Sequence, residues 1–170
     1  VRALMMKAKV EGVETSMLEA TLRVNEAQPF KIVELARQVA GELSGKRIGV
    51  LGLAFKPGTD DMRDAASIKV VDALLCEGAE IHAYDPEALD NARKIFEDKI
   101  VYAKRAEEAL SDADVCIIVT EWPEFADPKL YSHMRGEVII DGRRVLNPSM
   151  LPTHARFTYN AIGFPKTVKT

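Results

Sequence analysis

The sequence is poor in cysteine, histidine and aromatic residues. Its 170 residues include 2 cysteines and 3 histidines, and 6% of them are aromatic. Cys76 falls in a helical pattern and Cys116 in an apolar strand, so we expect both to be small core residues. So few ligand-type side chains argue against a disulfide framework and against a metal site.

The sequence also lacks a large charge excess and a long apolar run. The formal net charge is -3 at pH 7, and the lysines and arginines are scattered rather than striped, so nucleic acid is not an expected partner. The apolar run at 115–119 is far too short to cross a bilayer, and no secretory leader precedes it. These absences predict a soluble, cytoplasmic protein with no membrane partner.

The first 45 residues are predicted to be helical. Apolar residues recur at helical spacing over 15–43, and Ser16 with Glu19 three residues later forms a candidate capping box. Pro29 lies inside this pattern and is expected to bend the helix or divide it in two. The chain opens VRALMMKAK, as if already inside a helix and without an initiating methionine, which indicates a piece of a longer protein.

From residue 46 onward, strand patterns alternate with helix patterns. This alternation predicts a mostly parallel sheet in a Rossmann-like, three-layer α/β/α domain. We therefore divide the chain into a helical segment, 1–45, and an α/β domain, 46–170. The expected strands lie at 48–54, 79–85, 99–103, 114–122 and 137–141, and an extended piece at 156–163 could add an edge strand.

A parallel sheet binds ligands beyond the carboxyl ends of its strands, near the point where the strand order reverses. The loops selected by this rule are 55–63, 120–125 and 141–146. Two of them carry lysine or arginine, so together they suit an anionic ligand such as a nucleotide.

The first of these loops begins like an NAD-binding turn but then departs from it. A dinucleotide fingerprint places three glycines in one tight turn, with an acidic residue about 20 residues further on to bind the ribose. Gly49 lies within the strand, and the long insertion FKPGTDDMRDAA separates Gly52 from the helix. Asp85 precedes Pro86 and could equally cap the next helix. Direct NAD binding by this turn is therefore not favoured.

The same loop admits two interpretations. Lys56 and Arg63 could bind phosphate or sugar oxygens while Phe55 offers an apolar face to a base. Alternatively, Asp60 or Asp61 caps the following helix, the two cations neutralise these carboxylates, and Phe55 is a core residue. The two arginines of the DGRR stretch are equally open to ligand contact or to solvation.

Four collinear stretches carry a resemblance to a known family: ATLRVNEAQPFKIVELA, LGLAFKPGTDDMRDAAS, VTEWPEF and IIDGRRVLNP. In that order and spacing they resemble the C-terminal part of the UDP-glucose 6-dehydrogenases, within the UDP-glucose/GDP-mannose dehydrogenase family. The resemblance covers nearly the whole chain. VTEWPEF looks more like the UDP-glucose branch than the GDP-mannose or UDP-N-acetylmannosamine branches.

The resemblance implies a division of labour in the parent protein. An upstream Rossmann domain would bind NAD, the central helix within 1–45 would form a homodimer, and the α/β domain would bind the UDP-sugar. Phe55, Lys56 and Arg143 are then expected to contact the UDP-sugar, with Arg143 reaching it from its own or the neighbouring subunit. Arg63 would reach the NAD bound by the other domain.

The implied reaction is the two-step oxidation of the C6 alcohol of UDP-glucose to the carboxylate of UDP-glucuronate, with two NAD and a cysteine nucleophile. In the family this cysteine lies in GGxCFPKD, immediately upstream of an xxAL sequence, and this chain begins VRAL. Neither Cys76 nor Cys116 matches, so no catalytic residue is expected here and the chain alone should be inactive. Two alternatives stay open: another nucleotide-sugar dehydrogenase, or a free-standing Rossmann-like binding module.

Overall fold

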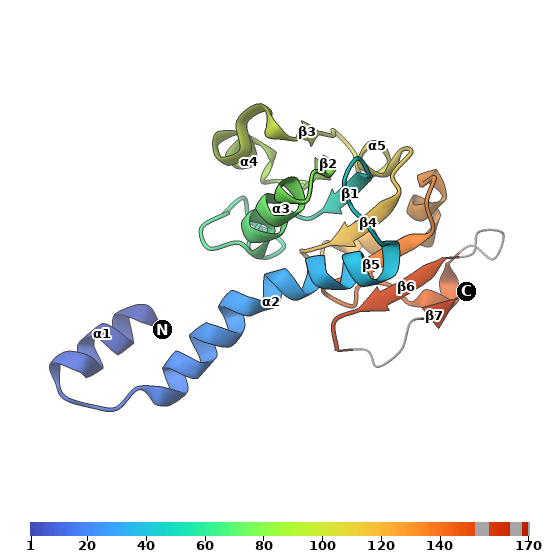
Figure 1. Ribbon diagram of the computed structural model, residues 1–170. Helices are drawn as coiled ribbons and strands as arrows, with labels where there is room; N and C mark the ends of the chain where they lie inside the picture. Colours follow the sequence, from blue (N-terminus) through green and yellow to red (C-terminus); the bar gives the residue numbers. More distant parts are fainter. Residues whose placement is uncertain (152–156, 164–167, 170) are drawn as a thin grey trace.

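The computed structural model describes residues 1–151, 157–163 and 168–169. These residues form a seven-stranded sheet in the order β3-β2-β1-β4-β5-β6-β7 (Figure 1). The first six strands run parallel, and β7 pairs antiparallel with β6. The strands are β1 Arg47–Leu51, β2 Glu80–Tyr84, β3 Val101–Tyr102, β4 Val115–Ile118, β5 Val138–Asp141, β6 Thr158–Ala161 and β7 Val168–Lys169.

The strand order reverses between β1 and β4, as it does in doubly wound nucleotide-binding folds. Their register pairs Ile48 with Val115 and Leu51 with Ile118. β4 is buried throughout, and a strand covered on both faces reads as an unbroken apolar run. The predicted mostly parallel, Rossmann-like sheet is confirmed. The strand predicted within 156–163 is β6, but the edge of the sheet is formed by β7, which pairs with β6.

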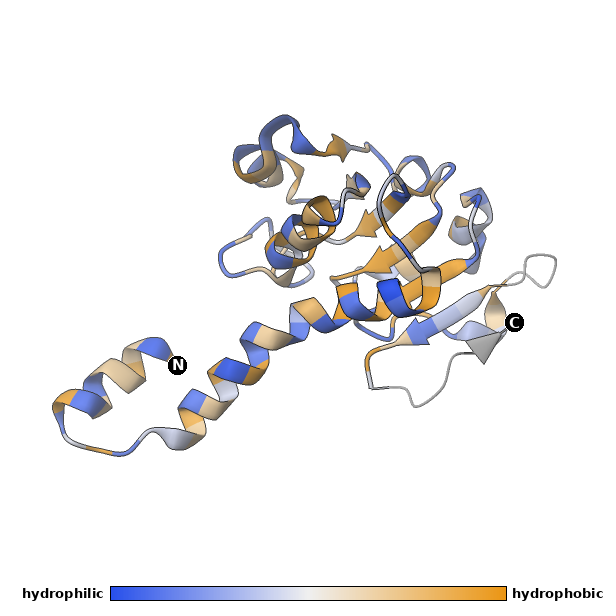
Figure 2. Cartoon of the chain, in the orientation of Figure 1, coloured by the Kyte–Doolittle hydropathy of each residue, from blue (hydrophilic) through white to orange (hydrophobic). Residues whose placement is uncertain are grey.

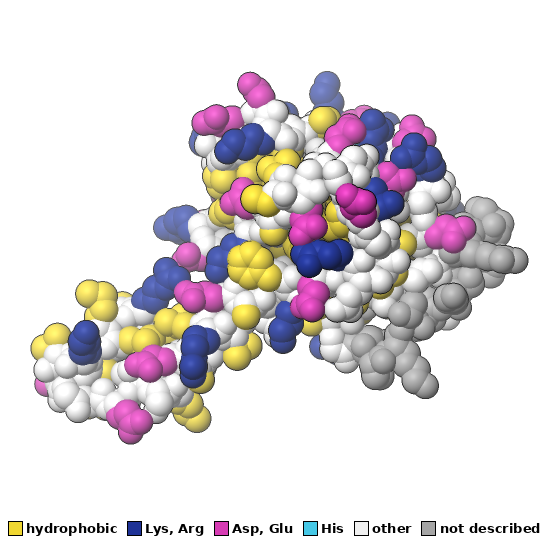
Figure 3. Space-filling view, viewed as in Figure 1, with side chains coloured by type: hydrophobic (Ala, Val, Ile, Leu, Met, Phe, Trp, Pro, Cys, Tyr) yellow, Lys and Arg dark blue, Asp and Glu magenta, His cyan; other side chains and the backbone are white. Residues whose placement is uncertain are grey.

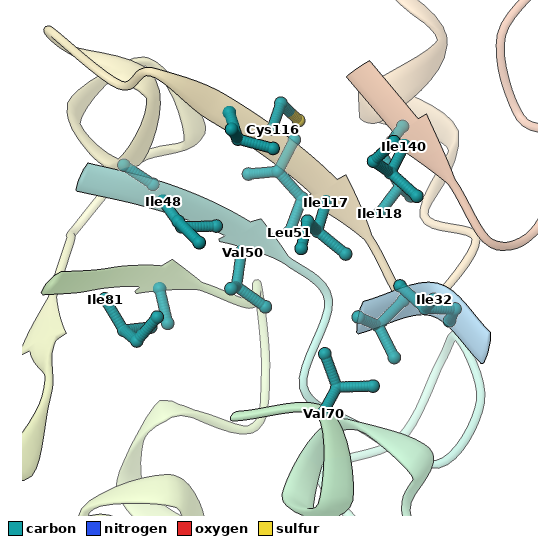
Figure 4. Packing of buried hydrophobic residues seen from close by; sticks show 14 of the residues in the cluster. Ile32, Ile48, Val50, Leu51, Val70, Ile81, Cys116, Ile117, Ile118 and Ile140 are labelled. Carbon is teal, nitrogen blue, oxygen red and sulfur yellow. The ribbon is translucent and has the colours of Figure 1, made fainter. Parts of the chain in front are cut away.

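Helices cover both faces of the sheet. α2 and α3 pack together, α2 against β4 and β5 and α3 against β2, and Figure 4 shows Ile32 of α2 and Val70 of α3 on the same side of the sheet. α5 packs on β1 from the opposite face, where a Cβ on Gly49 would lie 2.6 Å from Leu110 Cδ2. The α-helices are α1 Arg2–Val10, α2 Ser16–Ala40, α3 Ala66–Cys76, α4 Leu89–Phe96 and α5 Ala106–Leu110; the 3-10 helices are η1 Glu97–Lys99, η2 Pro123–Ala126, η3 Pro128–His133 and η4 Pro148–Met150.

The start and the middle of α2 differ from their predictions. Thr15 is the N-cap residue, and its Oγ1 rather than that of Ser16 donates a hydrogen bond to Glu19 Oε1 (2.9 Å), so the predicted Ser16 capping box is wrong. Pro29 was expected to bend the helix or to divide it, and because the helix continues through Pro29 the second alternative is wrong. Pro29 is buried, and packing therefore holds the helix together where proline removes one backbone hydrogen bond.

The two halves of α2 have different surroundings. Pro29, Ile32, Val33 and Ala36 in the second half are buried, and the last three belong to the same core as the apolar strands. Figure 2 shows that the strands in the middle of the sheet are mostly hydrophobic. The division of the chain at residue 45 stays a prediction, and this core includes residues from both sides of it.

We call residues 2–24, which comprise α1, the loop after it and the beginning of α2, the N-terminal arm. None of the arm's helical residues is buried, and an exposed ion pair between Arg2 and Glu26 (3.2 Å) joins α1 to α2. Hydrophobic side chains are visible on the surface of the arm (Figure 3). The large exposed ones are Leu4, Met6, Val10, Val13, Met17 and Val24.

The two cysteines have different environments. Cys116 is buried in β4, as predicted, and burial raises the pKa of its thiol. Cys76 is exposed at the end of α3 because it is turned away from the buried Val71 and Leu74, so its prediction as a core residue is wrong.

Within the described ranges, no cluster of three or more His, Cys, Asp or Glu residues could hold a metal ion, and no helix has the length and apolarity that a membrane span requires.

Candidate functional site

An open cleft of about 1150 Å³ lies beyond the carboxyl ends of β1, β4 and β5, next to α2. Each of the three predicted loops contributes to its wall, because these strands are neighbours and their carboxyl ends point the same way. The sheet side of the cleft is lined by Phe55, Lys56, Val119, Glu121, Gly142 and Arg143, and the α2 side by Leu22, Asn25, Gln28 and Ile32 among others.

Asp141 fixes the loop that carries Arg143. It is fully buried at the end of β5, and its Oδ1 accepts a hydrogen bond from the backbone N–H of Arg143 (2.9 Å). Its Oδ2 accepts from the N–H of Leu146 and from the hydroxyl of Tyr159, both at 3.0 Å. Burial and the Asp141 carboxylate raise the pKa of Tyr159, so this hydroxyl stays protonated and keeps donating. The loop after β5 is thereby tied to its own strand and to β6.

The Arg143 side chain reaches the loop after β4. Its Nε donates to the carbonyl of Val119 (2.8 Å) and lies 3.2 Å from Glu121 Oε2, while the side chain remains 40% exposed beside the cleft. A guanidinium already oriented in this way can present its other N–H groups to an anion at a low entropic cost. Arg144 is not part of the cleft wall and has a positive φ of 58°.

Phe55 and Lys56 form the part of the cleft wall that follows β1. The N–H of Phe55 donates to the carbonyl of Asp61 (2.8 Å), which closes the loop, and Phe55 is 51% exposed. The interpretation of Phe55 as a core residue is therefore wrong. The carboxylate of Asp61 pairs with Arg63 rather than with Lys56. An exposed aromatic ring and an ammonium group thus stand together in the cleft.

Arg63 does not line the cleft that the other three predicted site residues share. Its side chain is 91% exposed and donates to both carboxylate oxygens of Asp61 at 2.7–3.1 Å, and this hydrogen bonding lowers the pKa of Asp61 to about 2. Arg63 lines a neighbouring depression of about 630 Å³ with Asn91 and Lys94, and this depression shares Asp64 and Ile68 with the cleft. The interpretation that Arg63 neutralises a neighbouring carboxylate is confirmed. The interpretation that Asp60 or Asp61 caps the following helix is wrong, because α3 has no side-chain cap.

The turn after β1 does not fit a dinucleotide. Asp85 is fully buried, and its Oδ1 caps the turn toward α4 by accepting from the N–H groups of Glu87 (2.9 Å) and Ala88 (2.8 Å). Gly52, at φ 87°, is packed so closely that a Cβ would lie 2.6 Å from the backbone nitrogen of Thr120. The N–H groups of Gly52, Leu53 and Ala54 already donate to Tyr84 and Asp85, so this turn has no free N–H groups there for a pyrophosphate.

Gln28 of α2 was not singled out by the sequence. Its Oε1 is buried without a hydrogen-bond partner among the described residues, and Gln28 lines the cleft. A buried carbonyl-type oxygen without a donor is costly, so this position suits a ligand that brings a hydroxyl or an N–H. The only signal in the sequence was the polar stretch NEAQ directly before a helical proline.

A sequence model of the UDP-glucose/GDP-mannose dehydrogenase family, UDP binding domain, matches residues 49–148. The matched range holds the loops after β1, β4 and β5 and all four predicted site residues. The chain belongs to the UDP-glucose/GDP-mannose dehydrogenase family. The sheet side of the cleft therefore lies within the UDP-binding domain of this family.

Several similar proteins are UDP-glucose dehydrogenases. The enzyme AglM from Haloferax volcanii is 44% identical over 146 residues, 85% of this chain and 33% of AglM. The enzyme TuaD from Bacillus subtilis is 36% identical over 166 residues, 96% of this chain and 36% of TuaD. The solved UDP-glucose dehydrogenase from Pyrobaculum islandicum matches with a TM-score of 0.75 and 32% identity over 88% of this chain and 36% of that chain. This chain spans about a third of the length of these relatives.

Proposed function

We propose that the chain is the UDP-sugar-binding part of an NAD-dependent UDP-glucose 6-dehydrogenase. The observation that carries the proposal is the convergence of Phe55, Lys56 and Arg143 from two separate loops on one cleft at the strand switch point. The names of the relatives support the UDP-glucose branch of the family over the GDP-mannose branch.

The chemistry of the cleft suits a nucleoside diphosphate sugar. The Lys56 ammonium and the Arg143 guanidinium would bind diphosphate or sugar oxygens, with Arg143 held ready by Val119 and Glu121. The exposed ring of Phe55 offers an apolar face to the uracil or the ribose. Gln28 Oε1 would accept a hydrogen bond from a ligand hydroxyl, which would relieve its buried, unpaired state.

The oxidation itself would need groups outside this chain. In the proposed enzyme an upstream domain binds NAD and supplies the cysteine nucleophile, and the C6 alcohol is oxidised in two steps to the carboxylate. Val1 lines the same cleft as Arg143, so a nucleophile a few residues upstream would be near the bound sugar. Cys116 is buried and Cys76 does not line the cleft, so neither replaces it. Arg63 is 91% exposed and would exchange its ion pair with Asp61 for the NAD of the other domain.

The arm provides the proposed dimer contact. Its large apolar side chains are exposed within the described residues, and a segment with this many exposed apolar side chains suits an interface. A homodimer through α2 would bury it, in line with the isologous contacts of most homodimers.

Isothermal titration calorimetry of the chain tests the proposed function. UDP and UDP-glucose are expected to bind more tightly than NAD, because the turn after β1 is closed to a dinucleotide while the cleft is open. UDP-glucose should also bind more tightly than GDP-mannose. Tighter binding of NAD would overturn the assignment, and tighter binding of GDP-mannose would assign the chain to the other branch.

A further inference from the structure

We propose that Asp85 and Trp122 are positioning residues for the cleft, which together hold the loops that carry Phe55, Lys56 and Arg143. This inference rests on the proposed function, since it concerns the cleft that would bind the UDP-sugar. Neither Asp85 nor Trp122 lines the cleft, so both act through the backbone that carries the ligand-facing side chains.

The carboxylate of Asp85 joins the ends of β1, β2 and β4. Its Oδ2 accepts hydrogen bonds from the N–H groups of Leu53 (2.7 Å) and Ala54 (2.9 Å), the two residues directly before Phe55. The same oxygen accepts from the indole Nε1 of Trp122 (3.0 Å), while Oδ1 holds the turn toward α4. Asp85 is 0% exposed, and a buried carboxylate with several N–H donors makes a strong, charge-assisted junction.

The other polar groups of the same backbone are paired as well. The carbonyl of Leu53 accepts from Ser67 Oγ (2.5 Å), and the carbonyl of Ala54 accepts from Thr120 Oγ1 (2.6 Å). With the N–H groups held by Asp85 and the carbonyls held by these hydroxyls, the backbone before Phe55 has a single satisfied arrangement. The direction in which Phe55 and Lys56 leave the sheet is therefore set by this junction.

The Trp122 side of the junction extends to Arg143. Trp122 directly follows the segment whose Val119 carbonyl and Glu121 carboxylate hold the Arg143 guanidinium. Trp122 is 9% exposed, and Asp85 is its hydrogen-bond acceptor. The buried carboxylate of Asp85 thus orients the loop that carries Lys56 and the loop that holds Arg143, although it contacts neither cation.

Asp114 offers a matched control at the opposite end of the sheet. It precedes β4 and accepts from the N–H of Arg47 (3.0 Å) and from the guanidinium of Arg135 (2.7–3.1 Å). Asp114 therefore also ties two strands together, but at their amino ends, away from the cleft. Its replacement should cost stability without moving the loops that face the ligand.

The test compares the variants Asp85→Asn, Trp122→Phe and Asp114→Asn in the chain. UDP affinity is measured by calorimetry at one temperature for all variants, about 20 °C below the lowest of their thermal midpoints, so that nearly all molecules are folded. Trp122→Phe keeps the aromatic body and removes only the indole N–H. We expect UDP to bind about tenfold more weakly to Trp122→Phe and at least tenfold more weakly to Asp85→Asn, and within about twofold of the unaltered chain to Asp114→Asn.

The outcomes separate this inference from the proposed function. Absence of UDP binding to the unaltered chain would overturn the proposed function and this inference with it. If UDP binds to Trp122→Phe and Asp85→Asn as tightly as it binds to the unaltered chain, the inference alone is overturned. If Asp85→Asn does not fold, Trp122→Phe decides, because it leaves four of the five hydrogen bonds to Asp85 in place.

Discussion

The loops at the carboxyl end of the sheet and the N-terminal arm are held in opposite ways. The loops after β1, β4 and β5 are fixed by two fully buried carboxylates, Asp85 and Asp141, each saturated with protein donors. The arm has no buried residue in its helices, and the exposed Arg2–Glu26 pair joins α1 to α2. The cleft between them therefore has one preorganised wall and one wall that continues into uncovered apolar surface.

Because of this difference, substitutions in the two regions should affect different properties of the protein. Changes at the buried carboxylates and at the groups they orient should act on folding and on ligand affinity. Changes on the arm should act on assembly and leave the sheet intact, because packing inside the domain does not depend on the arm's exposed side chains.

The largest expected effect is at Asp141. Asp141→Asn should lower the free energy of unfolding by about 2–4 kcal/mol, because an amide cannot accept from all three donors and leaves buried groups unsatisfied. Urea unfolding followed by circular dichroism measures the change. The control Asp72→Asn, on the exposed face of α3, should change it by less than about 0.5 kcal/mol. An unchanged midpoint for Asp141→Asn would show that this carboxylate does not hold the loop.

The next effect is on ligand affinity at Arg143. Arg143→Ala should raise the dissociation constant for UDP roughly ten- to a hundredfold, since charge-assisted hydrogen bonds contribute about 1.5–3 kcal/mol each. Calorimetry measures it. The control Arg144→Gly removes the same charge from the next residue and accommodates the positive φ of 58° found there, so UDP affinity should stay within about threefold. Equal losses for both variants would mean that Arg143 has no special place in the cleft.

Much of this wall of the cleft could be predicted from the sequence. The unbroken apolar runs of β1, β4 and β5 indicate strands buried on both faces, and the parallel-sheet rule then places the loops that follow them at one edge. Phe55, Lys56 and Arg143 were named on that basis together with the family resemblance, and the structure brings them to one cleft.

The rest depended on contacts between residues far apart in the chain. Asp85 was read as a ribose-binding acid or a helix cap, because its links to Leu53 and Trp122 exist only after the sheet forms. Cys76 matched the helical pattern of a core residue, but the packing of α3 decides which side of its last turn faces solvent. Pro29 suggested a bend or a division of the helix, and its burial against the domain keeps α2 in one piece.

A substitution on the arm is expected to change the oligomeric state and to leave the fold unchanged. The chain should be a dimer at micromolar concentration, and Val24→Glu should convert it to a monomer, because Val24 is 55% exposed on the apolar surface of the arm. Light scattering measures the mass, and circular dichroism should show an unchanged fold. The control Lys99→Glu, on an exposed residue of η1 far from the arm, should remain a dimer. A monomeric unaltered chain would contradict the proposed interface.

The smallest expected effect on UDP binding is at Arg63. Arg63 lies outside the cleft and is 91% exposed, so Arg63→Ala should change UDP affinity by less than about twofold. In the whole enzyme the same substitution should weaken NAD more than UDP-glucose, if Arg63 reaches the other domain as proposed. Weakening of both ligands to the same extent would mean that Arg63 and Arg143 have been assigned to the wrong ligands.

The pH dependence of Asp61 sharpens this last comparison. Hydrogen bonds from Arg63 lower the Asp61 pKa from 3.8 to about 2. A lowered folded-state pKa means that the stabilisation from this pair is present above pH 3.8 and is lost as the pH falls through about 2. Between pH 5 and pH 8 the pair should therefore leave both stability and UDP binding unchanged. Carboxyl NMR titration should show the Asp61 pKa rising toward 3.8 in Arg63→Ala, and an unshifted pKa in that variant would show that the contact with Arg63 is not formed in solution.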